Sequence, residues 1–186
     1  MRRGSATPPY IVAPFAKSVG RDLVMECNCT APGHNHAETQ NHTPAMKRSA
    51  TAVWNGALKT GNGNLTAPGG ALHATPYSFN SRFASGAGTN PEELIAAAHA
   101  GCFAMALSAT LGEAGFTPER LEATAEVSLD NVPPAGWTVT ASHLKLTAKI
   151  PGIDAAKFAE LAAKAKAGCP ISRLLNATVM LDAELA

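Results

Sequence analysis

The most informative pattern along the chain is a mostly apolar stretch, residues 94–111, that carries no charged side chain. Asn90 suits the N-cap of a helix, Pro91 suits its first position, and Gly115 is a typical C-terminal signal. We therefore expect one long helix over 90–114. Because this helix is apolar on nearly every side, we expect other elements to surround it.

The chain before this helix has short segments with the alternation that is typical of strands. We expect a first strand over 49–54, followed by a hairpin turn at Asn55-Gly56. Two weaker strands are expected around 57–60 and 63–67. A further extended segment is expected over 71–83, where aromatic and polar residues alternate.

Two long strands, 122–130 and 137–150, are expected after the helix, joined by a turn that contains two prolines. Asp154 is the N-cap of an amphipathic helix, a short helix follows from Cys169, and a last strand covers 177–185. This order of elements predicts an α+β fold, with helices packed on a largely antiparallel sheet.

The first 45 residues show neither a strand period nor a helix period and have little to bury. We expect 1–45 to be a disordered N-terminal extension and 46–186 to be the folded domain, with Met46 as a candidate native start. The extension contains a group of metal-binding residue types: Cys27, Cys29, His34, His36 and His42. Thiolates and imidazoles bind zinc or copper, but this spacing is a weak motif, and accidental composition is the favoured interpretation.

Composition and charge fit a compact soluble protein. Apolar residues make up 46% of the chain, charged residues 16%, and the net charge is +1. No basic surface for nucleic acid is expected, and no membrane span, because no run of about 18 consecutive apolar residues exists. The basic start is interrupted by prolines and makes a poor signal peptide, so we expect a cytoplasmic location. In that compartment the cysteines are expected to be reactive, metal-binding or inert.

Two cysteines stand out in the predicted domain. Cys102 lies in the middle of the apolar helix, where a thiol either fills a core or reacts. Burial raises the pKa of a thiol, so a reactive Cys102 requires a nearby cation. Cys169 falls at the N-cap of the short helix, where peptide dipoles favour a thiolate, although a small turn residue explains it as well. Their separation matches neither a zinc site nor a thioredoxin motif, but it fits an attacking and a resolving cysteine.

The predicted domain has four arginines that could supply the cation: Arg48, Arg82, Arg120 and Arg173. Arg48 and Arg120 are disfavoured, because the first precedes the first strand and the second follows an expected exposed turn. Arg82 ends the aromatic-rich segment shortly before the long helix, and Arg173 competes because it is near Cys169 in sequence. An arginine fork needs a carboxylate to orient it, and Glu92 or Glu93 could serve. Each of these charges also has an ordinary interpretation, as a solvated side chain or as a first-turn residue that favours the helix dipole.

Five motifs occur together in this order: F-N-S-R-F, G-T-N-P-E-E-L-I-A-A-A-H-A-G-C-F-A-M-A-L-S, L-G-E-A-G-F-T-P, V-P-G-I-D-A-A-K-F and K-A-G-C-P-I-S-R-L-L. From about residue 47 to the end the chain resembles the OsmC (osmotically inducible protein C) family. The H-A-G-C-F version resembles the OsmC branch rather than the sister organic hydroperoxide resistance proteins.

The resemblance implies antiparallel sheets wrapped around long central helices in an intertwined homodimer. It implies a peroxidase of oxidative and osmotic stress defence that reduces organic hydroperoxides, and hydrogen peroxide less well, without a metal or flavin. Carried across, Cys102 is the peroxidatic cysteine and Cys169 the resolving one. Arg82 lowers the pKa of Cys102 and polarises the peroxide, and Glu92 orients Arg82, with Glu93 as the alternative.

A geometric argument supports the dimer. Glu92 and Cys102 are ten positions apart, about 15 Å along a continuous helix. An arginine held by Glu92 therefore cannot reach the sulfur of its own chain unless the helix bends. We expect each site to be built from both chains of a homodimer.

Other residues near the cysteine keep two interpretations. His99 shares a helix face with Cys102 and either assists proton transfer or is a hydrogen-bonded core histidine. The apolar residues Phe79, Phe103 and Met105 either line a substrate pocket or belong to the core.

The leading functional hypothesis is a thiol peroxidase that an external dithiol reduces; relatives in the resembling family suggest a lipoyl-type reductant. The alternatives are a non-catalytic stress protein that binds a small molecule or metal, and a purely structural dimer.

Overall fold

The computed structural model describes residues 46–186, which form one compact unit. It contains two three-stranded sheets, one with the order β1-β2-β3 and one with the order β4-β5-β6. The predicted extension 1–45 lies outside the described residues, and so do its five metal-binding residue types. Its disorder and the start at Met46 therefore stay predictions.

The first sheet is antiparallel and is formed by β1 (Thr51–Asn55), β2 (Asn62–Thr66) and β3 (Thr75–Ser78). The predicted hairpin exists, but its loop is longer than the expected two-residue turn, because Asn55 pairs with Asn62. The weak strand expected around 57–60 is wrong, since those residues lie in this loop.

The extended segment that we expected over 71–83 is wrong at both ends, because residues 71–74 form bends before β3 and α1 (Phe79–Phe83) follows it. Ser78 and Ser81 make a reciprocal capping box, in which each side chain accepts from the backbone N–H of the other residue. Phe79 and Phe83 are four positions apart, and their rings pack at 4.8 Å between centroids. The aromatic spacing is therefore that of a helix turn rather than a strand.

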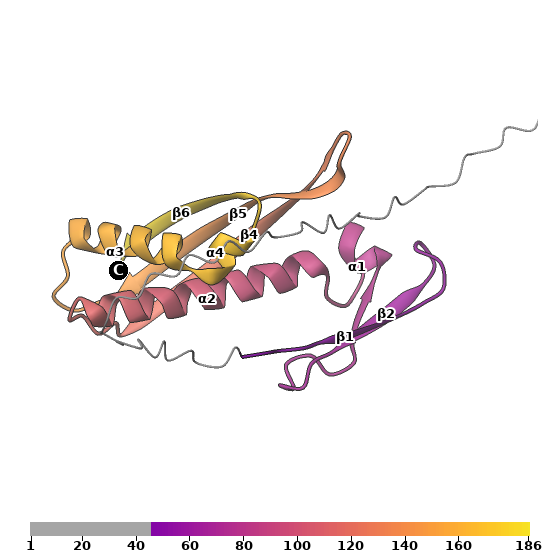
Figure 1. Ribbon diagram of the computed structural model, residues 1–186, viewed down its shortest axis with the longest axis horizontal. Coiled ribbons are helices and arrows are strands. Elements are labelled where there is room, and N and C mark those ends of the chain that lie inside the picture. The colour runs from indigo at the N-terminus through magenta and orange to yellow at the C-terminus, as the bar shows by residue number, and fades with distance from the viewer. Residues whose placement is uncertain (1–45) are drawn as a thin grey trace, which may run out of the picture. The chain divides into compact units, whose positions relative to one another are not determined.

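The long helix α2 (Pro91–Glu113) has the predicted bounds within one residue, with Asn90 as its N-cap. Figure 1 shows it running beside α3 and the second sheet, and its contacts are with β4, α3 and α4. Its buried residues are few: His99, Phe103, Leu107, Thr110 and Leu111. Met105, on another face, is 76% exposed. Within one chain the expectation that α2 is surrounded is therefore wrong, because the packed elements cover only part of it.

Among the described residues, α2 is the single helix whose length and composition would allow it to cross a membrane. Apolar core helices of globular proteins meet the same criterion, and α2 contributes three side chains to the core described below. The criterion therefore does not distinguish a membrane helix from a core helix here.

The second sheet carries the other helices. β4 (Arg120–Val132) and β5 (Gly136–Lys149) form the predicted antiparallel hairpin around the prolines, whereas β6 (Thr178–Leu185) is parallel to β5. The sheet is thus mixed, because the chain returns through α3 (Ala155–Gly168) and α4 (Pro170–Leu174) before β6 begins. Asp154 caps α3 as expected.

The main core lies between α2, α3 and one face of this second sheet. Its largest members are fully or almost fully buried: Phe103, Leu107, Leu111, Leu144, Leu146, Phe158 and Leu161. Cys169 belongs to the same cluster, and Cys102 packs against it. The core thus fixes both thiols between the middle of α2 and the junction of α3 with α4.

Candidate functional site

The structure brings Cys102 and Cys169 together. Both are free thiols, and they lie close enough for each to affect the pKa of the other. Cys102 lies in the middle of α2 and is partly exposed, whereas Cys169, between α3 and α4, is 0% exposed. The separated cysteines of the sequence are therefore neighbours, as two residues that form a disulfide must be.

Cys169 is held by the local chain geometry. It ends α3 by donating its N–H to the Ala165 carbonyl at 2.9 Å, and it is the N-cap of α4, with Pro170 as the first residue of that helix. Its sulfur makes no full N-cap hydrogen bond. The N–H groups of Ile171 and Ser172 and the Ser172 hydroxyl nevertheless interact with it.

These surroundings move the two thiols in opposite directions. Burial raises the pKa of Cys102 above its ordinary value, and the neighbouring Cys169 adds to this, although the Ile171 N–H opposes it. Burial also acts to raise the pKa of Cys169. The N–H of Ser172, the Cys102 thiol and the Ser172 hydroxyl outweigh that effect, so the pKa of Cys169 is lowered. Within one chain, the surroundings thus lower the pKa of Cys169 and raise that of Cys102.

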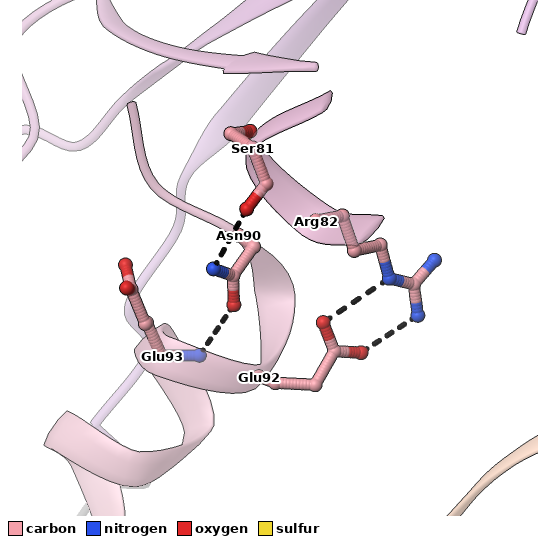
Figure 2. A network of polar contacts seen from close by, with 5 residues as sticks. All are labelled: Ser81, Arg82, Asn90, Glu92 and Glu93. Atoms are coloured by element: carbon pink, nitrogen blue, oxygen red, sulfur yellow. Dashed lines mark hydrogen bonds and ion pairs between the residues drawn. The ribbon is translucent and has the colours of Figure 1, made fainter. Parts of the chain in front are cut away.

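A second group of predicted residues meets at the start of α2. Glu92 accepts two hydrogen bonds from Arg82, from Nε at 3.1 Å and from an Nη at 2.7 Å, a fork-to-fork ion pair (Figure 2). The Glu92 side chain is 14% exposed and that of Arg82 34%. Glu93 points elsewhere and accepts from the Thr89 hydroxyl. Of the two carboxylates left open by the sequence, Glu92 is the partner of Arg82 in this structure.

Asn90 fixes this arrangement. Its side-chain carbonyl accepts from the Glu93 N–H at 2.9 Å and caps α2, while its amide donates to the Ser81 carbonyl at 3.2 Å (Figure 2). One residue therefore joins the start of α2 to α1, which carries Arg82. The capping role was predictable from the sequence, but the bond to Ser81 was not, because it depends on how α1 folds.

An apolar pocket of about 300 Å³ lies beside Arg82. Four aromatic side chains line it together with Pro91 and Leu58: Trp54, Tyr77, Phe79 and Phe83. Of the three apolar residues considered from the sequence, only Phe79 lines this pocket, whereas Phe103 is in the core and Met105 is on the exposed side of α2. Trp54 and Tyr77, whose rings pack at 5.3 Å between centroids, were not predicted from the sequence to line a pocket.

The ion pair and the thiol pair are separate within one chain. Glu92 and Cys102 are ten positions apart on a continuous helix, a distance of about 15 Å along its axis. Neither cysteine lines the pocket, and Arg82 does not contribute to the pKa of either thiol. The other three arginines, Arg48, Arg120 and Arg173, are exposed, and they do not contribute to the pKa of either thiol.

His99 is a hydrogen-bonded core histidine, one of the two interpretations that the sequence allowed. It is 0% exposed, and both ring nitrogens bond to serine hydroxyls, of Ser142 on β5 and Ser172 on α4. In residues 46–186 no group of three or more His, Cys, Asp or Glu side chains is placed to hold a metal ion.

The comparisons with known proteins agree with this fold and place the chain in a family. Residues 84–184 match the family model described as OsmC-like protein. The chain is 51% identical over 140 residues to peroxiredoxin OsmC of Escherichia coli (strain K12), covering 75% of this chain and 97% of that protein. The chain therefore belongs to the OsmC family.

Two further relatives represent the sister branch. An organic hydroperoxide resistance protein of Xanthomonas axonopodis pv. citri is 32% identical over 108 residues, which cover 55% of this chain and 70% of that protein. The crystal structure of the organic hydroperoxide resistance protein OhrB of Bacillus subtilis aligns with a TM-score of 0.54 at 28% identity, covering 74% of this chain and 98% of that one. The α+β fold is thus that of OsmC-like proteins.

Proposed function

We propose that this chain is a thiol-dependent peroxidase that reduces organic hydroperoxides to alcohols. The observation that carries the proposal is the contact between Cys102 and Cys169, which puts a partly exposed thiol against a fully buried one. The relatives named peroxiredoxin and organic hydroperoxide resistance protein support the same activity. They do not favour the alternative of a non-catalytic binding protein.

The reaction starts at Cys102, the more accessible sulfur. Its thiolate attacks the distal peroxide oxygen and breaks the O–O bond, so that sulfur is oxidised to a sulfenic acid and the organic oxygen leaves as an alcohol after taking a proton. Cys169 then attacks the Cys102 sulfur, and a disulfide forms with loss of water. An external dithiol returns two electrons and two protons; we propose a dithiol of the lipoyl type and no metal or flavin.

We propose that the active unit is a homodimer in which Arg82 of one chain serves Cys102 of the other. Three observations support it: the roughly 15 Å of helix between Glu92 and Cys102, the raised pKa of Cys102 without a cation, and the exposed apolar side of α2. A guanidinium beside the sulfur would lower its pKa, and its fork would polarise the peroxide. The pocket beside Arg82 would accept the organic group, which favours organic hydroperoxides over hydrogen peroxide.

Nucleic acid and membrane are not partners in this proposal, and the location is cytoplasmic, where dithiol reductants keep such a pair cycling.

The test is mass spectrometry of the reduced protein after one equivalent of cumene hydroperoxide. We expect rapid loss of the two thiol hydrogens, a Cys102–Cys169 link in the digest and full reversal by dihydrolipoate. A Cys169→Ser variant is the matched control, and it should stop at a Cys102 sulfenic acid that dimedone traps. Thiols that stay reduced in the wild-type protein would refute the proposed function.

A further inference from the structure

The proposed reaction leaves one buried titratable residue without a role. His99 lies three residues before Cys102 on α2 and is 0% exposed. Its Nδ1 is 2.7 Å from the Ser142 hydroxyl, and its Nε2 is 2.8 Å from the Ser172 hydroxyl. Neutral imidazole has one donor and one acceptor nitrogen, so these two hydroxyls satisfy it fully.

Ser172 connects this histidine to a reacting sulfur. Its hydroxyl lies 2.8 Å from His99 Nε2. It also lies in the first turn of α4, whose N-cap is Cys169, and it helps to lower the pKa of that thiol. A hydroxyl can accept from a thiol while it donates to an imidazole, and it can reverse both bonds after a proton has moved. Ser172 is therefore placed between the Cys169 thiol and the imidazole of His99.

Cys169 needs such a path because it is 0% exposed. A thiol must lose its proton to attack a sulfenic acid, and water cannot reach this sulfur to take the proton. Neither a carboxylate nor an amine is among the groups that act on Cys169. Within the described residues, the base that is hydrogen-bonded to the neighbouring Ser172 hydroxyl is His99.

The surroundings of His99 suit a base that starts neutral. Burial lowers its pKa below 6.5, and no charged group of the described residues contributes. The titratable groups that share the site are Cys102 on α2 and Cys169 at the end of α3, while β5 contributes the neutral Ser142. On α4, Arg173 is exposed, and the next residue along β5, His143, pairs with Asp182 of β6.

We propose that Ser172 and His99 form a proton relay that deprotonates Cys169 while it closes the disulfide. This inference rests on the proposed function. The Cys169 proton moves to the Ser172 oxygen as the Ser172 proton moves to His99 Nε2, while Nδ1–H donates to Ser142. The thiolate attacks Cys102, and its electron pair forms the S–S bond as hydroxide leaves. His99 then returns its proton, so the net step converts one sulfenic acid and one thiol into a disulfide and water.

A purely structural histidine would make different predictions. Such a histidine would only join β5 to α4, so loss of the Ser142 hydroxyl and loss of the Ser172 hydroxyl would disturb the packing equally. A relay depends on the Ser172 hydroxyl above all, because Ser142 lies outside the path to sulfur. Loss of the Ser172 hydroxyl should also change the pH dependence of disulfide closure, whereas a change in packing alone should not.

The experiment separates the two oxidation steps by rapid mixing of the reduced protein with cumene hydroperoxide, acid quench and mass spectrometry, from about pH 6 to about pH 9. In Ser172→Ala and His99→Gln we expect Cys102 oxidation within about twofold of wild type and disulfide closure about 10- to 100-fold slower at neutral pH. Closure in these variants should rise steeply with pH, because the thiolate then forms only by direct ionisation. Ser172→Thr keeps a hydroxyl and should close nearly as fast as wild type.

Each outcome decides the matter. Closure in Ser172→Ala at the wild-type rate, with the wild-type pH profile, overturns the relay while the peroxidase stands. Equal slowing in Ser172→Ala and Ser172→Thr, or an equal effect of Ser142→Ala with an unchanged pH profile, overturns it in favour of a structural role. If the wild-type protein forms no disulfide at all, the proposed function has failed, and the relay fails with it.

Discussion

The start of α2 and its middle differ in how their polar side chains are stabilised. At its start, Arg82 and Glu92 form a partly exposed ion pair that needs only its own chain. Ten residues later, the partly exposed Cys102 meets the buried Cys169, and burial raises the pKa of Cys102. The first region has a cation but no thiol, and the second has two thiols but no cation. In the proposed mechanism the two regions must therefore come together from different chains.

The largest effect should come from the thiol region. Cys102→Ser removes the nucleophile, so we expect peroxide consumption to fall about 1000-fold or more, because a hydroxyl cannot replace a thiolate at neutral pH. Steady-state peroxide assays give the rate, and circular dichroism should show an unchanged fold. If Cys102→Ser still reduces peroxide at the wild-type rate, Cys102 is not the nucleophile.

The next effect should come from the ion-pair region. Arg82→Ala should lower the rate of Cys102 oxidation about 100-fold, since it removes the cation that would stabilise the thiolate and the leaving oxygen. Thiolate absorbance during a pH titration should show a higher Cys102 pKa in the variant than in the wild-type protein. An unchanged titration would separate Arg82 from the sulfur altogether.

Mixed dimers of these two variants sharpen the comparison. A Cys102→Ser chain still offers Arg82, and an Arg82→Ala chain still offers Cys102. If each site uses both chains, each mixed dimer has one intact site and one site that lacks both residues. Random reassortment makes about half of the dimers mixed, so about a quarter of the wild-type activity should return. If each site belongs to one chain, mixing restores nothing.

A smaller effect is expected from Asn90 at the start of α2, where stability and activity can be measured separately. Asn90→Ala should lower the free energy of unfolding by about 1 kcal/mol, because it removes the N-cap. It should also slow peroxide reduction, since it unties α1, and with it Arg82, from α2. Asp154→Ala is the matched control, because it removes the N-cap of α3 and should cost similar stability with no loss of activity. Equal activity in both variants would deny Asn90 its positioning role.

The smallest effect is a pH dependence of stability. The pKa of His99 is below 6.5 in the folded protein because of burial, so the unfolded chain takes up that proton first. The free energy of unfolding should therefore fall as the pH drops through about 6.5. Urea unfolding at several pH values measures it, and His99→Gln should flatten this dependence. A slope that is identical in wild type and variant would contradict the assignment.

The sequence predicted the helices best where local signals are strong. Asn90-Pro91 and Asp154 begin α2 and α3 as expected, because capping acts over a few residues. The segment before α2 was wrong in part, because alternation of aromatic and polar residues hid the capping box at Ser78. The direction of β6 was missed as well, since strand pairing depends on how distant elements pack.

The candidate site was predictable in its residues but not in its electrostatics. The motifs indicated both cysteines and the arginine with its carboxylate, and the structure pairs them as Cys102 with Cys169 and Arg82 with Glu92. The serine partners of His99 were missed, because contacts across 43 and 73 positions leave no local pattern.

The unequal burial of the two sulfurs also bears on how the proposed disulfide would be reduced. An external dithiol would attack Cys102, the partly exposed sulfur, so the mixed disulfide would form there and Cys169 would be the leaving group. The N–H and hydroxyl contacts that lower the pKa of Cys169 also make its thiolate a better leaving group. Reduction would thus begin at Cys102, whichever dithiol supplies the electrons.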